Sequence, residues 1–559
     1  MLTVHRWIRC VGGLLLAGSV SASEVAVQID VHRGADPNVD YAALLAHGPW
    51  DDRNYALTAA DVAWLPESDR QHGDPVPAFF RIELRRRWQL DLEADGKHYP
   101  KRALNQFLLE AKGYLINGHY YRDVRRQADG HFEIQRSDEP ELGEADWDWP
   151  KFLSGEVRLS TPNGAAESAI AINPVNPNIV IAGTNGPTRP QTMWRSSDGG
   201  DTWALGGALP GNECCDPTVG WSSDGSIAYT ASLINGVPFY RSTDNGANWS
   251  LVTELSSGSD KEYLHVDLHP SSPNLDNIYL CWHDDNVQKF ARSTDLGLTF
   301  GSVITVDSGS FGIGCDITSD TAGNVYYVYP RTSNGGDIRI ATSTNGGSSF
   351  GAATTVADTL GNFDFALPSM ESRNVFIYVS ADVDLSNGPF KDSVYVAFTD
   401  NTGPDSGSAA NNHGRVRVAF RRAGSSTWNV TSPHPTADSN TIDRYQQWMR
   451  VDDQGRVHVI FYDTRHSTNR TGVDLYYNVS SDGAQTWGEP LRLTAVTSPN
   501  ITDGFEWGDY QGLDLLMNDV IAIYTDNRNE GGGGAQSVDV YVAGGFNGPG
   551  DNLFSNGFE

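Results

Sequence analysis

The sequence predicts an all-β protein, a seven-bladed β-propeller preceded by a small α+β domain. Three observations predict it. A motif of the form Ser-x-Asp-x-Gly-x-Thr-Trp recurs along the chain, each copy lies between two short strand-like runs, and two further strand-like runs precede each copy. A four-strand unit that repeats in this way is typical of a propeller blade, because each sheet buries its faces against its neighbours.

Composition limits the possible partners. The 559 residues include 40 Lys and Arg against 70 Asp and Glu, a formal net charge of −30 at pH 7. Nucleic acid and anionic membranes would repel such a chain. Hydrophobic residues make up 39%, enough for a large core. No run after the N-terminal segment reaches the ~18 apolar residues that a membrane span requires.

Residues 1–22 predict an export signal peptide, and therefore a secreted or periplasmic protein. They combine a basic start, an apolar stretch and a small-residue cleavage site: His5, Arg6 and Arg9, then Val11 to Val20, then Val20-Ser21-Ala22. An exported chain can keep disulfides. The four mature cysteines, Cys214, Cys215, Cys281 and Cys315, allow three pairings, and the adjacent pair could instead be reduced and buried.

Residues 24–150 differ from the repeats and predict a small α+β domain that ends in an acidic linker. Helices are expected at 57–65 and 103–115, and a strand at 79–92. The run Arg85-Arg86-Arg87 in that strand favours a solvated or acid-pairing face over an anion site. Residues 546–559 are a C-terminal tail without an assigned role.

The repeated boxes predict hairpin turns. They begin at Ser196, Ser242, Ser293, Ser343 and Ser480, and a degenerate copy ends in Thr427-Trp428. A turn rich in Asp, Asn and Gly between apolar runs is a hairpin signal, and its Asp carboxylate can accept backbone N–H bonds. An aspartate that recurs in nearly every unit is structural rather than catalytic.

Seven units can be counted between residues 154 and 545, the predicted propeller. Their innermost strands are expected at 169–174, 218–222, 263–267, 315–318, 375–379, 448–452 and 512–516. The seventh unit lacks a box and an outer strand. Residues 154–160 resemble the outer strand of the sixth unit, so we expect the start of the chain to supply the missing strand and close the ring.

The boxes resemble those of the Asp-box (bacterial neuraminidase repeat) families. Three segments, which begin at Glu167, Asp260 and Arg456, increase the similarity to secreted bacterial sialidase-like proteins. A true sialidase resemblance would imply an arginine triad, a Tyr–Glu nucleophile pair and an Asp acid/base. The sialidase Phe/Tyr-Arg-Ile-Pro motif is matched only by Phe80-Arg81-Ile82-Glu83, outside the ring, so that arginine is not carried over. The familiar sialidase ring has six blades, which stays the alternative to seven.

The strand alignment predicts a site at the channel mouth, where innermost strands begin and second strands end. The candidate catalytic residues are Tyr510 as nucleophile, Glu506 or Asp509 as its base, and Glu262 or Glu167 as acid. The candidate substrate-binding residues are Arg331, Arg465 and Arg528, which would hold an anionic sugar, with Asp463 and Asp526. The alternative is that each Asp–Arg pair braces its own loop.

No cofactor is expected. The segment Asp382-x-Asp384-x-Ser386-Asn387-Gly388 spaces oxygen ligands two apart, but its glycine is one position late and no glutamate follows, so a solvated acidic loop is expected, with calcium as the alternative. The leading functional hypothesis is a sialidase-like glycoside hydrolase or related enzyme that cleaves anionic glycans. The alternatives are a non-catalytic glycan- or protein-binding propeller and a structural extracellular module.

Overall fold

The computed structural model describes residues 114–116, 119–126, 132–137 and 156–159 and, with short gaps, 165–546. The gaps are 188, 212–214, 234–235, 256–258, 285–286, 309–312, 332–335, 500–506, 517–518 and 529–538. The predicted signal peptide, the helix at 57–65, the strand at 79–92 and the C-terminal tail lie outside the described residues. Within the described part, no helix is long and apolar enough to cross a membrane.

The chain divides into two compact units, Met1–Asp148 with Leu553–Glu559, and Trp149–Asn552. In the first unit, β1 (Tyr114–Ile116), β2 (His119–Arg126) and β3 (Phe132–Ser137) form an antiparallel sheet in the order β1-β2-β3. The helix expected at 103–115 is therefore wrong at its end, because Tyr114 pairs with Tyr121 in the β1–β2 ladder.

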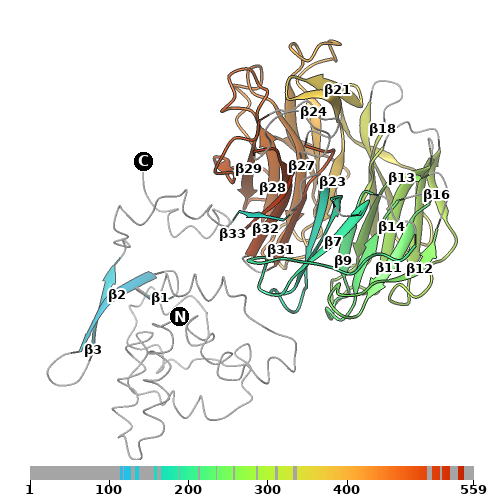
Figure 1. Cartoon of the computed structure of the whole chain (residues 1–559), viewed down its shortest axis with the longest axis horizontal. Helices are drawn as coiled ribbons and strands as arrows, with labels where there is room; N and C mark the ends of the chain where they lie inside the picture. Colours follow the sequence, from blue (N-terminus) through green and yellow to red (C-terminus); the bar gives the residue numbers. More distant parts are fainter. Residues whose placement is uncertain are drawn as a thin grey trace, which may run out of the picture. The chain divides into compact units, whose positions relative to one another are not determined.

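The second unit is a seven-bladed β-propeller of four-stranded antiparallel sheets, as the repeat predicts (Figure 1). Blades one to three are β5 (Ala166–Ile172), β6 (Val180–Asn185), β7 (Gln191–Ser196) and β8 (Ala204–Leu205); β9 (Thr218–Trp221), β10 (Ala228–Ala231), β11 (Pro238–Ser242) and β12 (Ser250–Glu254); β13 (Ser259–Val266), β14 (Ile278–Asp284), β15 (Val287–Ser293) and β16 (Ile304–Ser308). In each blade the first strand is innermost.

The remaining blades follow the same order. Blades four to six are β17 (Asp316–Ser319), β18 (Val325–Arg331), β19 (Asp337–Ser343) and β20 (Thr354–Asp358); β23 (Val379–Val383), β24 (Val394–Asn401), β25 (Gly414–Arg421) and β26 (Asn429–Thr431); β27 (Arg444–Val451), β28 (Val457–Asp463), β29 (Asp474–Ser480) and β30 (Leu491–Arg492). Blade seven is β31 (Gly512–Leu516), β32 (Asp519–Asp526), β33 (Asp539–Phe546) and β4 (Val157–Arg158).

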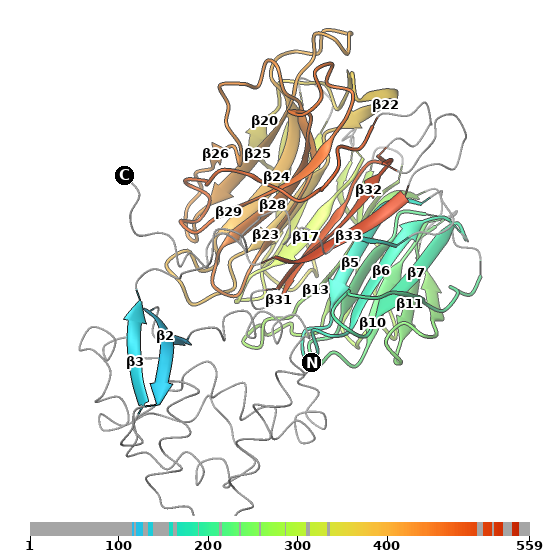
Figure 2. The ribbon, with the colours of Figure 1, turned by 60° about the vertical axis from the view of Figure 1, so that its left-hand side comes forward.

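The ring closes as the sequence predicts. The segment β4, from the start of the unit, pairs antiparallel with β33 through Val157 and Val542 and through Arg158 and Tyr541. Arg158 also donates to the buried Asp539 at 2.8 Å. Figure 2 shows β31, β32 and β33 beside β5. The outer side of β33 is therefore paired, and only the two-residue β4 is left at the edge of the last sheet.

The sequence misplaces one inner strand. Blade five begins at β23, and the expected strand at 375–379 instead overlaps β22 (Met370–Phe376), which pairs with β21 (Asp364–Leu367) in a separate hairpin. Alternating side chains are buried through both segments: Val375, Ile377, Val379, Ala381 and Val383. Because the alternation is continuous, the pattern alone does not separate hairpin from blade.

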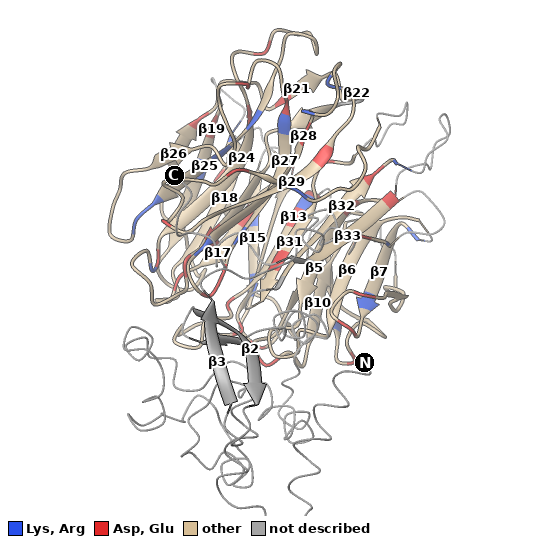
Figure 3. Ribbon diagram, turned by 90° about the vertical axis from the view of Figure 1, so that its left-hand side faces the viewer, with Lys and Arg blue, Asp and Glu red and all other residues tan. Residues whose placement is uncertain are grey.

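The boxes form the expected turns between third and outer strands. In blade one, Asp198 accepts hydrogen bonds from the backbone N–H and hydroxyl of Thr202, at 2.8 and 2.6 Å, and Trp203 donates to the carbonyl of Gly200. Aromatic and branched side chains fill the spaces between blades. In Figure 3 the charged residues lie mostly at strand ends and in loops.

Candidate functional site at the channel mouth

A left-handed backbone conformation marks the start of most inner strands. Four non-glycine residues there have positive φ: Glu167 (50°), Asp216 (60°), Lys261 (47°) and Gln446 (50°). The ladder register shifts beside three of them, at 166–168, 260–263 and 445–448. Such bulges re-aim side chains, and left-handed non-glycine residues cluster at functional sites. At these positions the side chains therefore do not follow the regular in-and-out alternation of a β-strand.

Asn185 connects the first two blades at the mouth. Its amide nitrogen donates to the buried Glu167 carboxylate and lies 3.4 Å from Oδ1 of Asp216. Its amide oxygen accepts the backbone N–H of Asp216 at 2.8 Å. One side chain at the end of β6 thus holds two carboxylates from adjacent blades in a shared position.

Lys261 lies among aromatic rings in the third blade. Its Nζ is 2.7 Å from the ring centre of Tyr510 and 4.5 Å from that of Tyr263. The side chain is buried, and within the described part its ammonium makes no hydrogen bond. Burial lowers the pKa of Lys261, against the opposing attraction of Asp216, Glu262 and other carboxylates.

Glu262 is a fully buried carboxyl group. Neither of its oxygens has a hydrogen-bond partner among the described residues. Burial raises its pKa well above the usual range, and the negative charge of Asp216 adds to the effect. This environment favours the protonated form of the carboxyl group, which can donate a proton.

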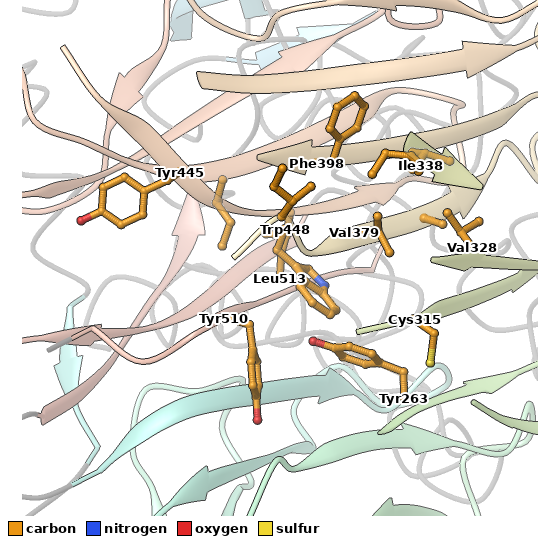
Figure 4. Packing of buried hydrophobic residues seen from close by; sticks show 14 of the residues in the cluster. Tyr263, Cys315, Val328, Ile338, Val379, Phe398, Tyr445, Trp448, Tyr510 and Leu513 are labelled. Atoms are coloured by element: carbon orange, nitrogen blue, oxygen red, sulfur yellow. The ribbon is translucent and has the colours of Figure 1, made fainter. Parts of the chain in front are cut away.

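Three rings from three blades meet beside these charges. Tyr263 lies 5.1 Å from Trp448 and 6.2 Å from Tyr510, centre to centre, and Figure 4 shows the three side chains converging. Burial and the carboxylates of Asp216 and Glu167 raise the pKa of Tyr510 well above normal. These surroundings disfavour a phenolate, so Tyr510 would need a base to accept its proton as it reacted.

The predicted catalytic residues are largely brought together. Glu167, Glu262 and Asp509 all act electrostatically on Lys261, whose ammonium lies over Tyr510. Glu506 lies outside the described residues. Lys261 and Asn185 were not predicted as site residues. Lys261 precedes the inner strand expected at 263–267, whereas β13 begins at Ser259 and its register shifts between 260 and 263.

The predicted arginines do not share a pocket. Arg331 pairs with Asp337 at 2.7 Å, Arg465 with Asp463 at 2.7 Å, and Arg528 with Asp526 and Glu156, both at 2.6 Å. The guanidinium groups of Arg465 and Arg528 also lie 4.0 and 4.6 Å from the rings of Tyr476 and Tyr541, which belong to third strands. Each arginine is thus held within its own blade.

A second charged group lies elsewhere along the inner strands. Burial raises the pKa of Asp316 and of Asp514 to about 6, and raises that of Asp382, while Arg450 opposes all three shifts. Arg450 forms no ion pair with these carboxylates among the described contacts; its guanidinium lies 5.3 Å from the Trp448 ring. Each carboxylate accepts a backbone N–H from a neighbouring blade.

The expected solvated loop at 382–388 is corrected by the structure. Asp382 lies on β23, and Asp384 is fully buried, with one oxygen accepting the backbone N–H of Ser386. The reason is that blade five begins later than expected, so its inner strand takes in the first of these acids. Among the described residues, no three His, Cys, Asp or Glu side chains are grouped to hold a metal.

The second unit is therefore a seven-bladed propeller in which buried acidic and aromatic side chains gather where the inner strands begin. A family model for a domain of unknown function, DUF8300, matches residues 40–125, before the ring. A xyloglucanase from Paenibacillus sp is 26% identical over 254 residues, which are 39% of this chain and 23% of that enzyme. The chain thus spans less than a quarter of that relative's length.

Similar solved structures include a polysaccharide lyase, an ulvan lyase bound to a GlcA–Rha3S oligosaccharide (12% identity, 70% of this chain and 96% of that one, TM-score 0.45). The BP39L lectin of Burkholderia pseudomallei is 12% identical over 69% and 97% of the two chains, with a TM-score of 0.45. The GH93 α-L-arabinofuranosidase of Fusarium graminearum is 12% identical over 58% and 96%, with a TM-score of 0.39.

Proposed function

We propose that this protein is an exported carbohydrate-active propeller that cleaves a glycosidic bond at the channel mouth. The observation that carries the proposal is a buried carboxyl group placed beside a second carboxylate. Glu262 is fully buried and its pKa is raised, in part by the charge of Asp216. Glycosidases divide their work between two such groups, one kept protonated and one ionised.

Each residue has a role in this proposal. Glu262 donates a proton to the leaving oxygen, and Asp216 or Glu167, both held by Asn185, acts as base or nucleophile. Tyr510 and Tyr263 present rings and hydroxyl groups to the sugar; neither hydroxyl has a partner among the described residues. The likeness to a xyloglucanase supports a carbohydrate substrate.

The finer hypothesis of a sialidase-like enzyme for anionic glycans has less support. It requires free guanidinium groups, whereas Arg331, Arg465 and Arg528 are each engaged with a carboxylate of their own blade. We therefore assign substrate binding to the residues around Glu262 and Tyr510. The three arginines instead stabilise the loops of their own blades. Export itself is proposed from residues 1–22; a mature N-terminus at Ser23, found by mass spectrometry of secreted protein, would support it.

The test is a reducing-sugar assay on xyloglucan, arabinan, ulvan, polygalacturonate and a fluorogenic sialoside. We expect turnover of at least one, and a loss of about 100-fold or more in kcat for Glu262→Gln, because a general acid contributes ~10²–10⁴-fold. Arg465→Gln, the matched control outside the mouth, should retain turnover. Binding of a glycan without turnover by the wild type would instead favour the non-catalytic binding propeller.

A further inference from the structure

The mouth contains the elements of an ammonium site. The Nζ of Lys261 contacts the faces of Tyr510 and Tyr263, and the carboxylates of Asp216, Glu167 and Asp509 attract it. A cation over aromatic faces with carboxylates nearby is the arrangement by which proteins recognise amines. Here the amine belongs to the protein.

We propose that this cage selects a sugar bearing a free amino group, and that Lys261 fills the cage when no ligand is present. The inference rests on the proposed function and names the substrate class of the same site. A hexosamine ammonium would take the place of the lysine ammonium over the Tyr510 ring. The ligand's hydroxyl groups would then meet polar atoms that have no hydrogen-bond partner among the described residues.

The position of Lys261 in the cage is energetically unfavourable. Its backbone is left-handed, with φ at 47°, a conformation disfavoured for residues with a Cβ. Its ammonium is buried without a hydrogen bond in the described part of the chain. Both Glu262 oxygens and the Tyr263 and Tyr510 hydroxyls are also buried without a hydrogen-bond partner among the described residues. A polar ligand would supply the hydrogen bonds that these groups lack.

The charge balance favours a cation over an anion. Around the cage stand four carboxyl groups and one ammonium. The arginines that could attract an acidic sugar are paired within their own blades, and Arg450 is faced by Asp316, Asp382 and Asp514. An acidic sugar would meet repulsion at the mouth, whereas an amino sugar would be attracted.

Calorimetric titration with three tetrasaccharides tests the inference: β-1,4-glucosamine, its fully N-acetylated form and galacturonate. The first two share the same backbone, and the N-acetyl group of the second removes the charge from the nitrogen. We expect the glucosamine tetramer to bind about 10-fold or more tightly than the acetylated form at low salt. The difference should shrink in 0.5 M NaCl, because salt screens the carboxylates.

Two variants distinguish a specific effect on amine binding from a general loss of folding. Lys261→Ala empties the cage and should tighten glucosamine binding severalfold while leaving the acetylated tetramer nearly unchanged. Asp216→Asn keeps the side-chain shape and should weaken glucosamine binding alone. Circular dichroism and thermal melts confirm that each variant is folded; if Lys261→Ala does not fold, the Asp216→Asn result decides.

Each outcome has one meaning. Equal binding of the two glucosamine forms, or tightest binding of the galacturonate tetramer, overturns the inference. Cleavage or binding of neutral glycans such as xyloglucan, without a preference for the amine, overturns it and leaves the proposed function standing. If no carbohydrate in either panel is bound or cleaved, both fail.

Discussion

The carboxylate of Asp514 accepts a hydrogen bond of 2.6 Å from the backbone N–H of Ile172, across the junction where the last blade meets the first. Two other junctions repeat the arrangement: Asp316 accepts from Ala381, and Asp382 from Val451, both at 2.8 Å. Aspartates on inner strands therefore fasten adjacent sheets near the axis. At the periphery, β4 closes the same ring.

Replacing Asp514 with Asn should change how stability depends on pH. Burial raises the pKa of Asp514 in the fold to about 6, above the 3.8 of an exposed aspartate. Between these values the folded state binds the proton more tightly, so ionisation of Asp514 lowers the free energy of unfolding as pH rises. The amide lacks this penalty and still accepts the Ile172 bond. From pH 4 to 7, Asp514→Asn should gain up to about 3 kcal/mol relative to wild type in urea unfolding. A constant difference across that range would contradict this assignment.

Interrupting the closing strand should expose an edge. Leu159 is buried and donates its backbone N–H to Val540 at 2.8 Å. Leu159→Pro removes that donor and opens β33 to intermolecular pairing, so we expect aggregation on size-exclusion chromatography. Leu159→Ala loses only apolar contacts and should stay monodisperse, with a stability loss of about 2–4 kcal/mol. Identical behaviour of the two variants would mean that the backbone pairing matters little.

The box aspartates should affect stability without affecting the site. Asp482 accepts bonds from the hydroxyl of Ser480 and from the backbone N–H groups of Thr486 and Gln485. Asp482→Ala should lower the free energy of unfolding by about 1–3 kcal/mol, with turnover and binding unchanged. Asp482→Asn should be tolerated, because Asn345 occupies the corresponding place in blade four and accepts the same backbone bond. A loss of turnover in folded Asp482→Ala would assign these turns to the site.

One of the possible disulfides joins two blades. Cys281 on β14 and Cys315 before β17 are bonded, across 34 residues of sequence. Replacing both with Ala should lower the free energy of unfolding by about 3–4 kcal/mol, the effect expected for a loop of this length. Dithiothreitol should destabilise the wild type more than the double variant, because in the variant it can act only on the bond of Cys215, which is also disulfide-bonded. Equal reductant effects in the two proteins would contradict a stabilising role for the Cys281–Cys315 bond.

The fold was predictable because the repeat encodes it. Boxes mark the turn between third and outer strands, and residues 154–160 carry the pattern of the strand that blade seven lacks; β4 confirms this prediction. The error in blade five came from an inserted hairpin. Its buried alternation continues from Val375 into Val383, so the boundary depends on pairing partners that lie distant in sequence.

The sequence could indicate site residues only where their position at the start of an inner strand determines which residues lie near them. Glu167, Glu262 and Tyr510 lie near Lys261, and strand position indicated this placement because inner strands begin beside them. The partners of the arginines were not predictable, because Arg465 can reach Asp463, two residues away, as readily as a ligand. Lys261 was missed because the inner strand was expected to begin at residue 263, whereas β13 begins at Ser259.

A crystal structure of the Glu262→Gln variant with an oligosaccharide that the protein binds or cleaves tests the central claim most directly. The account predicts a sugar ring at the channel mouth in contact with Tyr510 and Gln at position 262, with Arg331, Arg465 and Arg528 still paired to their own carboxylates. A sugar seated on those arginines, or anywhere remote from the mouth, would contradict it.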